Sequence, residues 1–279
     1  MERESFVVEV PGGRLGGWLA GEGPQVLLLH GGPGMSFKYI DWLADELGEG
    51  FRLAAYQQRG LAPSTTEGPF AVEREVADAI AVLDALGWDC AWVVGHSWGG
   101  HLLLHLAAAA PERLRGALAI DMLGGVGDGG AAAFEAAMLE RTPEDVRRRA
   151  QELDETAMRG DGTPADAIES MRLVWPAYFA DPAHILPFPD WGISVPAYSG
   201  LWDSVNAELP RLSAALPRIG VPFGFVAGDR SPIPPAEAAG ATAAAIPGAW
   251  IEIVAGAGHF PWFERPGSVR AALERLIRG

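Results

Sequence analysis

Apolar runs alternate with amphipathic segments along most of the chain, which predicts strands followed by helices. Residues 25–30 form a continuous apolar run, as expected of a strand buried on both faces of a sheet. Between two such runs, residues 72–86 place Val72 and Val76 on one helical face. We predict strands at 6–10, 15–20, 25–30, 51–56, 91–95, 114–121, 223–227 and 250–254. This order indicates an α/β protein with a mostly parallel eight-stranded sheet and helices on both faces.

The alternation stops between residues 122 and 219, where helical patterns replace it. Two helix starts at 142–145 and 163–166 each combine a threonine N-cap, a proline and a carboxylate in the first turn. We therefore expect a helical cap at 122–219, inserted into a core made of residues 1–121 and 220–279.

Aromatic residues crowd the second half of the predicted cap. They indicate either the core of that subdomain or an apolar pocket for a small molecule. For the pocket, the candidate substrate-binding residues are Trp175, Tyr178 and Trp202.

The segment 95–99 reads Gly-His-Ser-Trp-Gly and fits the pattern G-x-S-x-G. A buried strand is predicted before it and a helix after it, so the serine sits on a sharp turn that exposes its hydroxyl. We predict that Ser97 is a nucleophile. The glycine-rich segment 30–34 follows another strand and predicts an oxyanion hole, with the amides of Gly32 and Trp98 as donors.

A serine nucleophile needs a base, and six histidines are present. Only His259 lies on a loop that follows the last predicted strand. The order serine, acid, histidine along the chain then matches the arrangement of α/β-hydrolases. We predict that His259 is the base.

Nearly the whole chain resembles an α/β-hydrolase. Within that superfamily it resembles the proline iminopeptidase-like branch, through His-Gly-Gly-Pro-Gly at 30–34, Gln-Gln-Arg-Gly at 57–60 and Ser-Trp-Gly-Gly at 97–100. It departs from that branch at Gln57, where aspartate is usual, and at His96, where glycine is favoured. The resemblance implies the α/β-hydrolase fold and hydrolytic chemistry.

Two residues compete for the role of the acid. In α/β-hydrolases the acid commonly follows the seventh strand as G-x-x-D-P, but Ser231 occupies that place here and Asp229 stands two residues earlier. Some members carry the acid at the end of the sixth strand, where this chain has Asp121. A carboxylate at either place can reach the far imidazole nitrogen. We prefer Asp121 and keep Asp229 as the alternative.

The charge balance limits the partners of the protein. The chain carries 36 acidic against 21 basic residues, so a phosphate backbone or an anionic membrane is a poor partner. Cys90 is the only cysteine, which excludes an intramolecular disulfide and a cysteine-based zinc cluster. We expect no signal peptide, membrane span, metal or cofactor, a cytoplasmic location and a small-molecule substrate. The oligomeric state stays open.

The predicted reaction is acyl transfer to water through an acyl-enzyme on Ser97. We expect cleavage of a small ester, lactone or amide with a hydrophobic part. One alternative is an aminopeptidase of the proline iminopeptidase type, which the resemblance implies. A second alternative is a non-catalytic ligand-binding protein on the same fold, because fold does not determine function.

Overall fold

Eight strands form one sheet in the computed structural model, which describes residues 1–158 and 163–279. The strand order is β1-β2-β4-β3-β5-β6-β7-β8. The six strands from β4 to β8 in this order pair parallel with one another. Antiparallel pairing joins β1 to β2 and β2 to β4. The strands are β1 (Arg3–Val10), β2 (Gly13–Ala20), β3 (Gln25–Leu29), β4 (Arg52–Tyr56), β5 (Ala91–His96), β6 (Leu114–Ile120), β7 (Phe223–Gly228) and β8 (Trp250–Val254). The predicted mostly parallel, eight-stranded α/β fold is confirmed.

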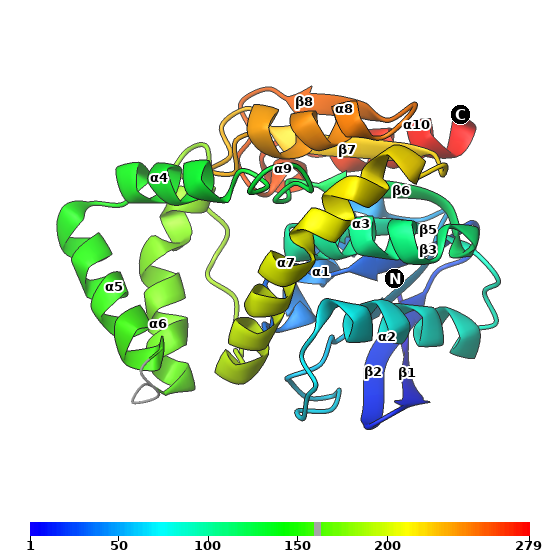
Figure 1. The fold of residues 1–279 in the computed structure, drawn as a ribbon, viewed down its shortest axis with the longest axis horizontal. Coiled ribbons are helices and arrows are strands. Elements are labelled where there is room, and N and C mark those ends of the chain that lie inside the picture. The colour runs from blue at the N-terminus through cyan, green and yellow to red at the C-terminus, as the bar shows by residue number, and fades with distance from the viewer. Residues whose placement is uncertain (159–162) are drawn as a thin grey trace.

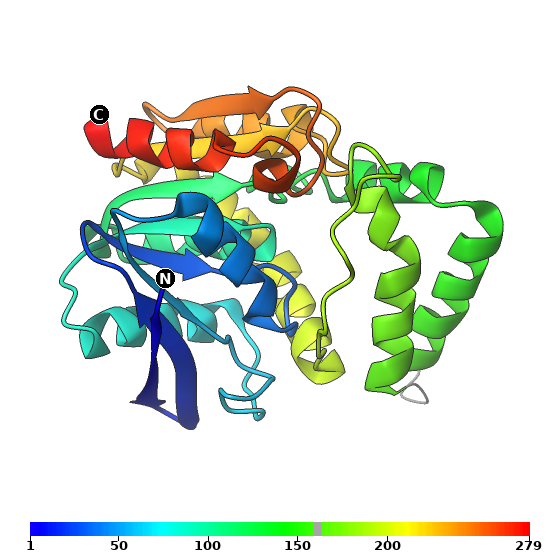
Figure 2. The ribbon, with the colours of Figure 1, turned by 180° about the vertical axis from the view of Figure 1, so that it is seen from behind.

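Helices cover both faces of this sheet because the central strands are apolar on both sides (Figures 1 and 2). One apolar cluster joins the sheet to α2, α3 and α8, and a second joins its other face to α1, α9 and α10. These helices are α1 (Ile40–Leu47), α2 (Val72–Ala85), α3 (Trp98–Ala109), α8 (Ala241–Ala245), α9 (Pro261–Glu264) and α10 (Ser268–Arg278). Short 3₁₀ or π turns lie at Phe37–Tyr39, Pro111–Arg113, Trp175–Tyr178, Leu216–Arg218 and Ala236–Gly240.

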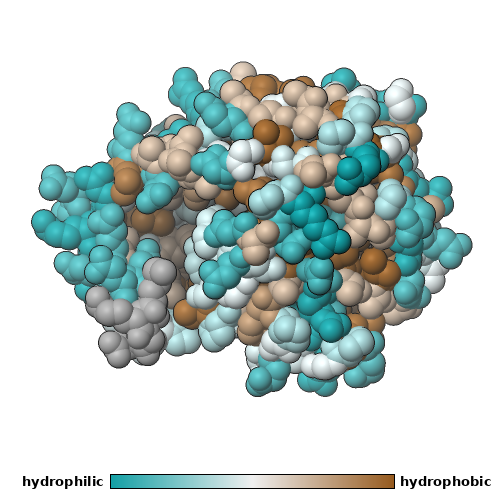
Figure 3. Space-filling view, viewed as in Figure 1, coloured by the Kyte–Doolittle hydropathy of each residue, from teal (hydrophilic) through white to brown (hydrophobic). Residues whose placement is uncertain are grey.

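Four helices lie in the described part of the segment between β6 and β7, where the cap is predicted. The last of them packs against α2 and α3, whereas α5 and α6 pair with each other beside the sheet (Figure 1). Figure 3 shows a hollow between that pair and the rest of the molecule. The helices are α4 (Ala131–Arg141), α5 (Glu144–Met158), α6 (Pro164–Val174) and α7 (Val195–Ala215). Positions 159–162 of the predicted cap lie outside the described residues.

The helix start predicted at 163–166 is present as a full capping box. The Thr163 hydroxyl accepts from the Asp166 amide, and the Asp166 carboxylate accepts from the Thr163 amide. None of the helices in residues 1–158 and 163–279 combines the length and apolar character needed to cross a bilayer.

A buried charged cluster ties α2 to the end of β4. The Arg59 guanidinium donates to both carboxylate oxygens of Asp78, at 2.5 Å from Nε and 2.9 Å from Nη2. Glu75 lies one turn earlier on α2 and is fully buried. Burial, and then the nearby charge of Asp78, raises the pKa of Glu75 to about 8.

Because Glu75 holds its proton more tightly in the folded chain, its ionisation should destabilise the fold. The ordinary pKa of the group is 4.5, so between that value and about 8 the folded state binds more protons and stability falls as pH rises. Denaturant unfolding should therefore show Glu75→Gln about equal to wild type near pH 4, below the ordinary pKa of the group. At pH 8.5 the variant should be more stable by at least about 1 kcal/mol. An equal difference at both pH values would contradict this reading of Glu75.

Candidate active site

Ser97 occupies a strained turn between β5 and α3. Its backbone has φ 55° and ψ −121°, which a residue with a side chain rarely adopts. The turn requires small neighbours, since a Cβ on Gly95 would collide with the Gly99 carbonyl and one on Gly99 with the Leu29 carbonyl. The strand-to-helix bend thus holds Ser97 at the carboxyl edge of the sheet, where open α/β sheets bind ligands.

The glycine-rich loop after β3 approaches this turn closely. A Cβ on Gly31 would lie 2.7 Å from the Ser97 Cβ. The Gly31 amide donates to Tyr39 Oη, so Gly32 is the next residue whose amide is a candidate donor toward substrate. Trp98 is the first residue of α3, and amides in a first helical turn have no intrahelical acceptor. Of the two predicted oxyanion donors, Trp98 directly follows Ser97, and Gly32 directly follows the glycine that packs against Ser97.

Two buried glutamines brace these donors, and sequence reasoning assigned them no role. Gln57 accepts from the Phe37 amide at 3.0 Å and donates to the Met35 carbonyl at 3.0 Å, which fixes the glycine-rich loop. Gln58 accepts from the Trp98 indole at 2.7 Å and donates to the His30 carbonyl at 3.0 Å. The only signal in the sequence was the segment 57–60, which appeared as a family resemblance.

The structure brings Asp121, and not Asp229, to His259. Asp121 follows β6 with φ 45°, and its Oδ2 lies 2.7 Å from His259 Nδ1. Asp229 instead accepts from the Gly256 amide at 2.6 Å on the exposed loop after β7. The hydrogen bond to Asp121 directs the other imidazole nitrogen, Nε2, toward the role of base. In the described part of the chain the Ser97 hydroxyl makes no hydrogen bond; such catalytic bonds often tighten only when substrate is bound.

Burial opposes charge on both members of this pair. Desolvation lowers the pKa of His259 to about 3, so the imidazole is neutral and able to accept a proton. Desolvation also raises the pKa of Asp121 to about 8. The Ser231 hydroxyl, the Gly228 amide and the Arg141 guanidinium act in the opposite direction on Asp121. These three groups favour the anionic form of Asp121, against the desolvation that favours its protonated form.

His96, the residue before the nucleophile, links three parts of the site. Its Nε2 donates to the His259 carbonyl at 2.9 Å, and its Nδ1 accepts from Tyr39 Oη at 2.8 Å. Burial, and then the neighbouring His259, lowers the pKa of His96 well below its usual value, which keeps this residue neutral. His96 thereby connects the nucleophile turn to the histidine loop and, through Tyr39, to Gly31.

The predicted substrate-binding aromatics occupy different settings. The Tyr178 ring lies 5.1 Å from the His259 ring, and the Tyr178 carbonyl accepts from the His259 amide at 2.8 Å. Trp175 is buried among other aromatic rings, and its indole donates to the Leu186 carbonyl at 2.8 Å. Trp202 lies on α7 and is 36% exposed. Of the three, only Tyr178 contacts the histidine.

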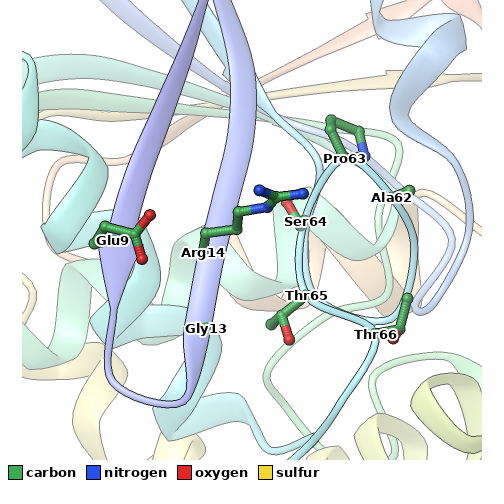
Figure 4. A pocket seen from close by; sticks show the side chains of 8 residues that line it. All are labelled: Glu9, Gly13, Arg14, Ala62, Pro63, Ser64, Thr65 and Thr66. Carbon is green, nitrogen blue, oxygen red and sulfur yellow. The ribbon is translucent and has the colours of Figure 1, made fainter.

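A separate groove of about 540 Å³ lies beside the β1–β2 hairpin (Figure 4), and Ser97 is not among its lining residues. Glu9, Arg14 and the loop 62–66 line it, and these residues include no histidine. Its Ser64 hydroxyl accepts from the Gly16 amide and donates to the Gln57 carbonyl. The groove therefore offers no base for a nucleophile, and the candidate site remains the one around Ser97.

A family model described as the alpha/beta hydrolase family matches residues 26–272. The chain belongs to the alpha/beta hydrolase family. Among curated proteins, this alpha/beta hydrolase is 33% identical over 104 residues to epoxide hydrolase B of Mycobacterium tuberculosis. That match covers 36% of the chain and 29% of the relative, so the chain spans only about a third of the relative's length.

Solved structures show the same fold across the whole alpha/beta hydrolase chain. A 2-hydroxy-6-oxo-6-phenylhexa-2,4-dienoate hydrolase from Rhodococcus has a TM-score of 0.73 and 19% identity, and the match covers 100% of this chain and 99% of that one. An enol-lactonase from Burkholderia xenovorans has a TM-score of 0.68 and 19% identity, with 98% and 100% covered. At these identities the likeness concerns the fold alone. The proline iminopeptidase-like branch is not confirmed by these relatives.

Proposed function

We propose that this alpha/beta hydrolase is a serine hydrolase that cleaves a small ester, lactone or amide with a hydrophobic part through an acyl-enzyme. The observation that carries the proposal is the 2.7 Å bond from Asp121 to His259, at the sheet edge where Ser97 stands on its strained turn. A buried acid that orients a neutral imidazole is the arrangement that activates a serine hydroxyl.

The proposed reaction has two acyl-transfer steps. His259 Nε2 takes the Ser97 proton while Oγ attacks the substrate carbonyl, and the resulting oxyanion accepts from the Gly32 and Trp98 amides. His259 then gives the proton to the leaving group as the carbonyl–heteroatom bond breaks. Water repeats these steps on the acyl-enzyme and restores the Ser97 hydroxyl. Tyr178, whose ring lies beside that of His259, is the cap residue that we expect a bound substrate to contact.

Epoxide hydrolysis, the activity in the name of the Mycobacterium relative, suits a serine nucleophile poorly. Attack of a serine oxygen on an epoxide forms an ether. An ether has no carbonyl for water to attack, so the enzyme would not be regenerated. Esters and lactones form an acyl-enzyme that water can cleave, and the name of the Burkholderia neighbour adds lactones to the substrates worth testing.

An aminopeptidase of the proline iminopeptidase type is the second candidate, because one cap carboxylate acts on Tyr178 beside His259. Burial raises the pKa of Tyr178, and the charges of Tyr198 and then of Asp154 on α5 add to the shift. A carboxylate in that position offers an ion-pair partner for the free ammonium of a peptide substrate.

A substrate panel read by rapid mixing separates these functions. We expect p-nitrophenyl esters with hydrophobic acyl groups to release a burst of nitrophenol equal to the enzyme concentration, followed by slower turnover. Prolyl and alanyl β-naphthylamides should turn over more slowly than the esters. Faster turnover of the naphthylamides would favour the aminopeptidase. No turnover of any ester, lactone or amide would favour a non-catalytic ligand-binding protein.

A further inference from the structure

One oxygen of Asp121 accepts two side-chain hydrogen bonds. Oδ2 lies 2.7 Å from His259 Nδ1 and 2.6 Å from Ser231 Oγ. The second oxygen, Oδ1, accepts from the Gly228 amide at 3.3 Å. Ser231 is 6% exposed and Asp121 is 1% exposed, so the bond between them is shielded from water. Ser231 therefore shares with the imidazole the oxygen that orients it.

The direction of the Ser231 hydroxyl follows from its second partner. The Ile233 amide donates to Ser231 Oγ at 3.0 Å. Because an amide only donates and a carboxylate only accepts, the single hydroxyl proton is directed at Asp121. Hydrogen bonds to a charged acceptor are stronger than those between neutral groups. Ser231 thus stabilises the anionic form of Asp121.

A residue of the cap holds the Ser231 main chain. Arg141, the last residue of α4, donates to the Ser231 carbonyl at 3.1 Å and to the Arg230 carbonyl at 2.8 Å. It also donates to the Ala177 carbonyl at 3.3 Å. One guanidinium therefore fixes the loop after β7 to two separate parts of the segment between β6 and β7.

In the part of the chain that the structure describes, few charged groups besides His259 act on Asp121. Arg141 brings its positive charge from α4, and His259 faces the carboxylate from the loop after β8. Glu264 on α9 acts on Arg141, and it anchors the histidine loop by accepting from the Gly258 amide at 2.5 Å. Its other oxygen accepts from the Ala180 amide at 2.8 Å. The cap is therefore bonded to the loops that carry Ser231 and His259.

We propose that Ser231 is a positioning residue that favours the anionic form of Asp121 and keeps its carboxylate directed at His259, and that Arg141 of the cap seats Ser231 for this role. The inference rests on the proposed serine hydrolase activity. The hydrogen bonds that attach the cap to the loop after β7 then help to keep the catalytic acid effective, so the cap does more than cover the substrate.

The test measures kcat, KM and the pH profile of ester hydrolysis in Ser231→Ala, per active site titrated with a fluorophosphonate probe. We expect kcat to fall about 10- to 100-fold at neutral pH, with KM nearly unchanged. The acid limb of the profile should move to higher pH, because loss of the hydroxyl raises the pKa of Asp121. Ser231→Thr keeps the hydroxyl and should recover most of the activity.

Thr242→Ala is the matched control, because Thr242 also carries a buried hydroxyl that both donates and accepts hydrogen bonds. It should leave kcat and the acid limb as in wild type. Arg141→Met should also move the acid limb to higher pH, by less than Ser231→Ala does. It replaces Ser231→Ala as the test variant if that variant does not fold. Wild-type kcat and acid limb in folded Ser231→Ala, or in folded Arg141→Met, would overturn the proposal. Failure of wild type itself to hydrolyse esters or to react with the probe would instead reject the serine hydrolase activity.

Discussion

Ser97→Ala should reduce ester hydrolysis about 10⁴- to 10⁶-fold while the protein stays folded. The reason is that no acyl-enzyme forms without the hydroxyl, whereas the proposed oxyanion donors, the amides of Gly32 and Trp98, remain. The turn itself should persist, because alanine accepts the backbone of Ser97 about as well as serine does. Steady-state kinetics with a p-nitrophenyl ester measure the loss, and circular dichroism with thermal melting verifies the fold.

The matched control for this loss is again Thr242→Ala, which removes a buried hydroxyl bonded to Gly125 and Ala238. It should hydrolyse the ester at nearly the wild-type rate. Ester turnover by purified Ser97→Ala at more than about one tenth of the wild-type rate would contradict the assignment of the nucleophile.

Asp121→Asn should lower kcat by about 10³- to 10⁴-fold. An asparagine that presents its amide to Nδ1 forces the proton of His259 onto Nε2, which then has no lone pair to accept the Ser97 proton. KM should change little, because Asp121 is buried behind the imidazole and does not reach substrate. Asp229→Asn should stay within about threefold of wild type, since its exposed carboxylate only accepts from the Gly256 amide.

The two asparagine variants are informative as a pair. Both variants replace a carboxylate by an amide at the end of a strand, β6 for Asp121 and β7 for Asp229. An effect on turnover that comes only from the lost charge would therefore appear in both. Near-wild-type turnover in Asp121→Asn, together with a loss of several orders of magnitude in Asp229→Asn, would assign the acid to Asp229 instead.

The fold was largely readable from the sequence because its signals are local. Each predicted strand overlaps an observed one, since apolar runs such as 25–30 and 91–95 are buried on both faces whatever the tertiary details. The position of Ser97 was readable for a similar reason: a strained turn needs glycines at fixed spacing around it. The catalytic roles of Ser97, His259 and Asp121 stay predictions until the variants are measured.

The residues that position and surround the candidate site could not be predicted from the sequence in the same way. Asp121 and Asp229 both follow strands, and the choice between them depends on a φ of 45° at Asp121 and on where the histidine loop lies. Arg141 acts through main-chain carbonyls, which leave no pattern in the sequence. The aromatic cluster predicts the same substrate-binding role for Trp175 and Tyr178. In the structure the Trp175 ring is buried, whereas the Tyr178 ring lies beside His259. Such differences arise only when distant segments meet.

The central claim is that Ser97 becomes covalently acylated during the reaction. The most direct measurement is mass spectrometry of peptides from the wild-type protein after reaction with a fluorophosphonate, with Ser97→Ala and Asp121→Asn treated in parallel. We predict one adduct per chain on the peptide that contains Ser97, none in Ser97→Ala and much slower formation in Asp121→Asn. An adduct on another residue, or ester hydrolysis that continues at the wild-type rate while Ser97 stays unmodified, would contradict it.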